Sequence, residues 1–142
     1  MPNLQAFLAQ NAEKAEIVEK VVSKRFKDEN GNPIPWHFGA ITGEEEDKIR
    51  KACTSKKPVP GKKGMFMPET DGALFATKLT VATIKFPDLH DASLQDSYGV
   101  KTAEALLGVM LLPGELTDAK QFAQEVNGYS VDFDDLVEEA KN

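Results

Sequence analysis

The segment 48–71 reads KIRKACTSKKPVPGKKGMFMPETD, and it separates the two parts of the fold that the sequence predicts. From Lys48 to Lys63 it contains seven basic residues and no acidic one, whereas the whole chain has a net charge of −6. Prolines at 58 and 60 and glycines at 61 and 64 exclude a helix through its middle. We therefore predict an extended basic loop at about 54–67 between two helical segments, which indicates an interaction surface.

The composition is typical of a folded protein. The 142 residues suit one domain over 1–142, and 41% of them are hydrophobic and 28% charged. An isoelectric point near 5.0 argues against a general nucleic-acid-binding protein. The single cysteine cannot form an internal disulfide, and the sequence shows neither a signal peptide nor an apolar stretch that could span a bilayer. We expect a cytoplasmic protein that binds neither nucleic acid nor membrane.

Residues 17–41 have the pattern of a β-hairpin. Ile34, Trp36 and Phe38 alternate along its second arm, which places them on one face. Pro35 lies in the same arm and indicates that this arm is at a sheet edge, at least locally.

The turn of this hairpin sets its register. Asp28–Gly31 fits a type I turn with a left-handed glycine, and this turn pairs Phe26 with Ile34 and Val22 with Phe38. A two-residue turn at Asn30 and Gly31 is the alternative, but it would bury less apolar area.

Helical signals account for most of the remaining chain, at about 70–140. Thr42 and Glu45 form a capping box for a helix that ends near Cys53. After the basic loop, a helix keeps large apolar residues on one stripe from Phe75 to Phe86 and ends at Pro87. Further helices are expected at 3–11, 91–98, 102–112, 113–127 and 131–141. The predicted fold class is α+β, with an N-terminal β-hairpin followed by a mainly α-helical part.

No motif in the sequence predicts chemistry. Gly61–Gly64 lacks both the spacing and the hydroxyl residue of a phosphate-binding loop. A calcium loop that starts at Asp28 would need glycine at its sixth position and glutamate at its twelfth, but these positions are Pro33 and Gly39. His90 lies among aspartates in a helix connector, and Cys53 at a helix end is best interpreted as structural. We predict no catalytic residue, no metal and no cofactor, and hence a protein that is not an enzyme.

Several short motifs occur in an order that resembles a known family. These are Arg50–Thr54, Pro58–Gly64, Pro68–Asp71, Leu94–Val100, and Ala105–Leu107 followed by Leu112–Glu115. The N-terminal Asn3–Leu8 and the hairpin with Trp36 are also similar. Over nearly its whole length the chain resembles the XkdN-like family of phage tail assembly chaperones.

The resemblance implies a non-enzymatic protein that acts during tail assembly in the host cytoplasm and is absent from the mature virion. Its implied partners are the tape measure protein, the tail tube protein, a longer frameshift product and a second copy of the chain. Two alternatives remain open: a structural tail or completion protein of the virion, and a small nucleotide- or phosphate-binding regulator that uses the lysine loop.

Two kinds of segment are candidates for binding a partner. Amphipathic helices at 3–11 and 131–141 would cover the apolar seam of a tape measure protein, unless they pack on their own core. The basic loop would add electrostatic attraction. The candidate residues are Phe7, Leu8, Lys56, Lys57, Pro58, Val59, Pro60, Gly61, Lys62, Lys63, Phe133, Leu136 and Val137.

Overall fold

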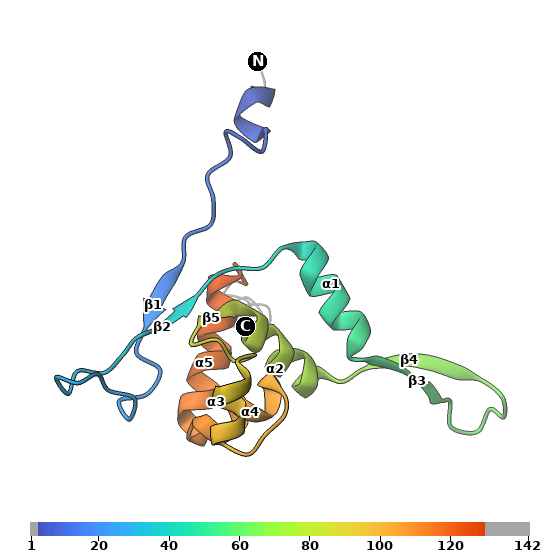
Figure 1. Ribbon diagram of the computed structural model, residues 1–142. Helices are drawn as coiled ribbons and strands as arrows, with labels where there is room; N and C mark the ends of the chain where they lie inside the picture. Colours follow the sequence, from blue (N-terminus) through green and yellow to red (C-terminus); the bar gives the residue numbers. More distant parts are fainter. Residues whose placement is uncertain (1–2, 130–142) are drawn as a thin grey trace, which may run out of the picture.

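The computed structural model describes residues 3–129 and has the α+β architecture that the sequence predicts (Figure 1). An antiparallel sheet has the strand order β1–β2–β5, and β3 and β4 form a separate two-stranded sheet. The strands are β1 (Val18–Lys20), β2 (Trp36–Phe38), β3 (Thr54–Pro58), β4 (Phe66–Thr70) and β5 (Ile84–Phe86). The helices are α1 (Gly43–Ala52), α2 (Gly72–Thr83), α3 (Ala92–Ser97), α4 (Ala103–Met110) and α5 (Pro113–Val126), preceded by the 3₁₀ turn η1 (Leu4–Phe7).

The hydrophobic core lies between the three-stranded sheet and helices α2, α4 and α5. Phe38 of β2 is fully buried and meets Phe122 of α5 edge to face, with 4.8 Å between the ring centres. Leu106 and Leu107 of α4 are also fully buried. These side chains join the sheet to the helices. We call the three-stranded sheet together with helices α1–α5 the body.

Asn127 connects three parts of the chain at one end of the body. Its Nδ2 donates to Thr83 Oγ1 at 2.8 Å, where α2 ends. Its Oδ1 accepts from the backbone N–H of Ile41 at 2.8 Å, just before α1. The end of α5 is therefore fixed beside both neighbouring segments.

The first hairpin follows the predicted register near its turn but not in its strands. The Ile34 N–H donates to the Phe26 carbonyl at 2.8 Å, and Gly31 has a φ of 82° in the predicted turn. In the strands, however, Phe38 pairs with Val18 and not with Val22, so that part of the predicted register is wrong.

Residues 21–25 leave the ladder because they make tertiary contacts. Ser23 is buried, and Arg25 Nη2 donates to the Met110 carbonyl at 2.6 Å and lies 3.1 Å from Glu115 Oε1. These contacts hold the segment against α4 and α5, which accounts for the offset of the strands.

Strand β5 corrects two predictions. The helix expected to reach Pro87 ends at Thr83, and Phe86 belongs to β5 and not to the helical stripe. Because β5 pairs with His37 and Phe38, β2 is the central strand and the second arm of the hairpin as a whole is not an edge, although Pro35 itself lies outside both ladders. Thr83 accounts for the helix end: its Oγ1 bonds to the Leu79 carbonyl, while its own carbonyl accepts from Gly39 N–H at 2.8 Å.

Local signals placed the other helix starts correctly. Thr42 and Glu45 form the predicted capping box of α1, and Pro113 occupies the first turn of α5. At the N-terminus the expected helix over 3–11 is wrong, since only η1 forms there, and Leu4 and Phe7 are largely exposed. The helix expected at 131–141 lies outside the described residues.

Candidate functional site

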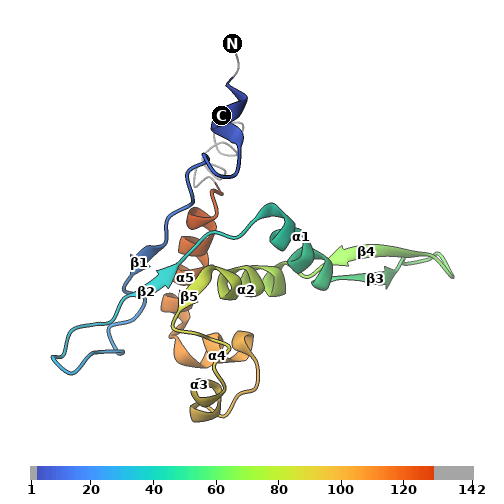
Figure 2. The same cartoon turned by 45° about the horizontal axis from the view of Figure 1, so that its top comes forward.

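The basic segment, expected to be an extended loop at about 54–67, is a β-hairpin. Strands β3 and β4 pair antiparallel from Thr54 opposite Thr70 to Pro58 opposite Phe66. The hairpin projects away from the body in both views (Figures 1 and 2). We call residues 54–70 the arm.

The base of the arm is fixed where α1 meets α2. The Asp71 N–H donates to the carbonyl of the buried Cys53 at 2.8 Å. Thr54 Oγ1 donates to the Arg50 carbonyl at 2.7 Å and lies 2.8 Å from Thr70 Oγ1. Both strands of the arm are thus hydrogen-bonded at their junctions with the helices.

The tip of the arm is a tight turn that presents two lysines. The Val59 N–H donates to the Met65 carbonyl at 2.9 Å, and the Lys62 N–H donates to the Val59 carbonyl at 3.2 Å. Gly61 and Gly64 have φ values of 76° and 82°, which other residues rarely adopt. Gly61 and Gly64 therefore make a hairpin turn between two strands, and not the turn from a strand into a helix that a phosphate-binding loop needs.

Three adjacent apolar residues on the arm are exposed. Met65, Phe66 and Met67 keep 53%, 61% and 55% of their surface accessible. Because side chains alternate along a strand, Met65 and Met67 lie on one face and Phe66 on the other. Sequence analysis missed these residues; the signal was an apolar run of three between a glycine and a proline at the end of a lysine-rich segment.

The register gives each face of the arm both apolar and basic side chains. One face carries Ser55, Lys57, Val59, Met65, Met67 and Glu69. The opposite face carries Thr54, Lys56, Pro58, Phe66, Pro68 and Thr70. Each face therefore combines an apolar patch with a lysine.

The strand edges of the arm are poorly suited to pairing with another strand. The bonds from Val59 to Met65 and from Asp71 to Cys53 fix the hydrogen-bonded positions, so Pro58 and Pro68 occupy outward-facing positions between them. Proline has no N–H to offer, and lysine on an edge opposes strand addition. The arm is thus better suited to bind through its side-chain faces.

The arm is strongly basic. Lys56, Lys57, Lys62 and Lys63 stand against a single acid, Glu69. Among residues 3–129, none of these four lysines forms an ion pair, whereas the lysines of α1 pair with acids one turn earlier. The arm therefore presents unpaired positive charge next to exposed apolar side chains.

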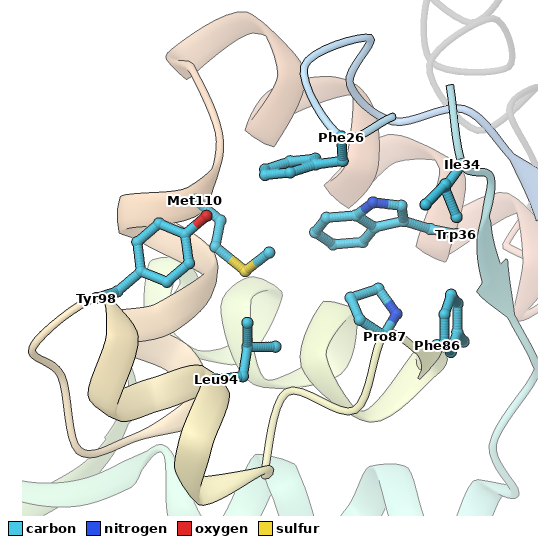
Figure 3. A pocket seen from close by; sticks show the side chains of 8 residues that line it. All are labelled: Phe26, Ile34, Trp36, Phe86, Pro87, Leu94, Tyr98 and Met110. Atoms are coloured by element: carbon cyan, nitrogen blue, oxygen red, sulfur yellow. The ribbon is translucent and has the colours of Figure 1, made fainter. Parts of the chain in front are cut away.

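A second feature is an apolar pocket of about 200 Å³ in the body (Figure 3). Its lining comes from the first hairpin, β5, α3 and α4: Phe26, Ile34, Trp36, Phe86, Pro87, Leu94, Tyr98 and Met110. Among these side chains only the Tyr98 hydroxyl and the Trp36 indole N–H can form ordinary hydrogen bonds. The pocket can hold one large apolar group, and its lining contains no carboxylate, imidazole, amine or thiol.

Several ionisable groups outside the arm take part in structural contacts. Hydrogen bonds from Tyr129 and Arg50 hold the pKa of Glu46 below its usual value. Burial, followed by the bond to Glu46, raises the pKa of Tyr129. His37 Nε2 lies 3.3 Å from Glu19, and its ring packs on Phe86. Over the described part of the chain, no group of three His, Cys, Asp or Glu residues is placed to hold a metal ion.

The structure brings only some of the predicted site residues together. The candidates from Lys56 to Lys63 share the arm. Phe7 ends η1 and Leu8 follows it, and this N-terminal segment lies apart from the arm in both views (Figures 1 and 2). Phe133, Leu136 and Val137 lie outside the described residues. None of the described helices is long and apolar enough to cross a membrane.

An α+β domain that exposes an apolar and basic arm has features typical of proteins that bind other proteins. Comparison with known proteins gives the family. The model of the phage XkdN-like tail assembly chaperone proteins matches residues 4–141. The chain therefore belongs to the XkdN-like family of phage tail assembly chaperones, which is not a class of enzyme.

Relatives from Bacillus subtilis (strain 168) match almost the whole chain. YqbN is 34% identical over 141 residues, covering 99% of this chain and 93% of its own length. The phage-like element PBSX protein XkdN is 33% identical over 143 residues, covering 99% of this chain and 94% of its own length. The crystal structure of the protein YqbN superimposes with a TM-score of 0.79 at 27% identity, over 92% of this chain and 99% of that one.

Proposed function

We propose that this protein is a holding chaperone that captures a tail protein, the tape measure protein first, on its β3–β4 arm before the tail tube polymerises. Membership of a tail assembly chaperone family supports the role in tail assembly. The observation that carries the choice of surface is the exposed run Met65–Met67 beside four lysines that form no ion pair within residues 3–129. The site of action is the host cytoplasm, and the protein is left out of the finished particle.

The contact is a side-chain face of the arm against the apolar seam of a helix. Prolines at the outward positions disfavour addition of a strand, so a helical client is the better fit. Methionine is unbranched and adaptable, which suits a client that presents many similar but unequal sites. The lysines increase the rate of encounter with acidic groups that flank the seam.

The exposed apolar area limits how tightly one arm can bind. Burying what remains exposed of Met65, Phe66 and Met67 would contribute roughly 4 kcal/mol, before the cost of association. Even before that cost is subtracted, this contribution corresponds to a dissociation constant no lower than about 1 mM, so stable capture needs the lysines or several chaperones along one client. Weak individual contacts allow the client to be released when the tube assembles.

The test is co-expression with the tape measure protein of the same gene cluster, followed by a solubility assay and co-purification. The wild-type protein should keep the tape measure protein soluble and elute with it. The variant Met65→Ser/Phe66→Ser/Met67→Ser should lose most of this capture. Val109→Ser/Leu112→Ser is the matched control, because both residues are apolar and about half exposed in the body.

Three outcomes would contradict parts of the proposal. Equal capture by the arm variant and the control would show that the arm is not the surface that binds the client. An insoluble tape measure protein beside a folded chaperone would remove this client, and the same assay with the tail tube protein would follow. Detection of the chaperone in purified particles would instead support the structural virion role.

A further inference from the structure

The chain leaves the described structure at a fixed position beside α1. Tyr129 follows α5, and its hydroxyl donates to the carboxylate of Glu46 on α1. Asn127, two residues earlier, is bonded to Thr83 and to the backbone of Ile41. The segment 130–142 therefore begins beside α1, and α1 leads directly into the arm.

The arm is within reach of this segment. From Glu46 to the end of α1 at Ala52 the chain rises about 9 Å, and the five residues of β3 add about 17 Å. Eight extended residues after Tyr129 span about 26 Å, which brings Val137 level with the far end of β3. Lys56, Lys57 and Met67 lie inside this distance.

The chemistry of the segment complements that of the arm. Residues 130–142 contain five acids and one lysine, the acids being Asp132, Asp134, Asp135, Glu138 and Glu139. Three large apolar residues lie among these acids: Phe133, Leu136 and Val137. The arm has the opposite charge, four lysines against one acid, and its own exposed apolar run.

We propose that the segment 130–142 docks on the β3–β4 arm of the same chain. Its acids lie against the arm lysines, and Leu136 and Val137, which are far enough from Tyr129, cover the near end of the exposed run Met65–Met67. Attachment in the same chain gives the segment an effective concentration in the millimolar range, so a contact too weak to hold separate molecules suffices.

When the segment 130–142 is docked, it covers the surface of the arm that would bind a client. An exposed apolar hairpin is a liability for aggregation, and a displaceable acidic cover removes it. This role as a cover that a client displaces rests on the proposed function, whereas the docking itself does not. The arm would then favour clients of the same kind, namely acidic segments with an apolar stripe.

The test is carbodiimide coupling of the full-length protein, because this reagent joins lysine amines to carboxylates that touch. Peptide mapping by mass spectrometry should find amide links from Lys56 and Lys57 to acids of 130–142. The Lys78–Glu104 ion pair, at 3.2 Å in the body, provides an internal reference for yield and folding. An equal mixture of ¹⁴N- and ¹⁵N-labelled protein distinguishes links within one chain from links between chains.

A variant that keeps every amine and carboxylate tests the apolar part of the contact. Phe66→Ser/Met67→Ser should lower the arm-to-segment links at least about fivefold relative to the Lys78–Glu104 link. Val109→Ser/Leu112→Ser should leave them unchanged. Raising the salt concentration should also lower them, since exposed charge pairs are screened.

Three results would overturn the docking. They are the absence of arm-to-segment links while the reference link forms, links spread equally over lysines of the body, and links that join mainly different chains. Failure of client capture in the co-expression assay would leave these links in place and remove only the proposed function. Loss of the links with capture intact would remove only the docking.

Discussion

Phe38 in the body and Phe66 on the arm differ in how far their side chains are buried. Both lie on short antiparallel strands, but Phe38 is fully buried against Phe122 while Phe66 keeps 61% of its surface exposed. The body uses its apolar residues to hold the sheet on α2, α4 and α5. The arm is stabilised by its ladder and its hydrogen-bonded base, so its apolar side chains are available to a partner.

Replacing each phenylalanine by alanine should affect stability very differently. Phe38→Ala leaves a cavity in the core and should lower the free energy of unfolding by about 3–5 kcal/mol. Phe66→Ala should change it by less than about 0.5 kcal/mol, because the side chain has little to lose. Urea unfolding followed by Trp36 fluorescence gives both values. Equal losses would show that the arm contributes to the core.

Asn127 tests whether the body depends on its polar connection as well as on its apolar packing. Asn127→Ala removes the bonds to Thr83 and to the Ile41 N–H and should cost about 1–3 kcal/mol. Gln124→Ala, an exposed change on the same helix, is the control. The same urea experiment measures both, and equal unfolding midpoints would contradict the connecting role of Asn127.

Charge reversal on the arm should weaken client capture without unfolding the protein. Replacing the four arm lysines by glutamate should raise the dissociation constant for the client about ten- to thirtyfold, since four exposed pairs that contribute about 0.4–0.5 kcal/mol each sum to about 1.4–2 kcal/mol. The control reverses Lys14, Lys24, Lys101 and Lys120, which changes the net charge by the same amount. Biolayer interferometry at two salt concentrations checks the result, and similar losses in both variants would indicate only a general charge effect.

The smallest expected effect is a pH dependence in the body. The pKa of Glu46 is lowered in the folded state, first by Tyr129 and then by Arg50. Its contribution to stability is therefore present above the usual glutamate pKa of 4.5 and is lost as the pH falls through the lower folded value. Tyr129→Phe should reduce the loss of stability between pH 7 and pH 3. Urea titrations of both proteins at the two pH values measure it, and parallel curves would contradict the assignment.

Elements with local sequence signals were predictable. The capping box of Thr42 and Glu45, Pro113 at the start of α5 and the turn that ends in Gly31 each act within a few residues. The three-residue strand β5 has no such signal, because it becomes a strand only by pairing with β2. The register of Val18 with Phe38 likewise depends on contacts of Arg25 with residues far along the chain.

The candidate site was predicted only in part, for a similar reason. The lysines of the arm were visible as a charge pattern, and the prolines and glycines correctly excluded a helix. The strands β3 and β4 could not be predicted, because Lys56, Lys57 and Pro58 have little strand propensity. They pair mainly because the two ends of the segment are held together at Cys53 and Asp71. Without the pairing, nothing indicated that Met65, Phe66 and Met67 would be exposed.

Site-specific photo-crosslinking tests the central claim most directly. A photoreactive phenylalanine analogue is placed at position 66 on the arm or at position 109 in the body, and each protein is co-expressed with the tape measure protein. Position 66 should form a cross-link to the tape measure protein, and position 109 should form little or none. Cross-linking at position 109 but not at 66, with both proteins folded and the tape measure protein soluble, would contradict capture on the arm.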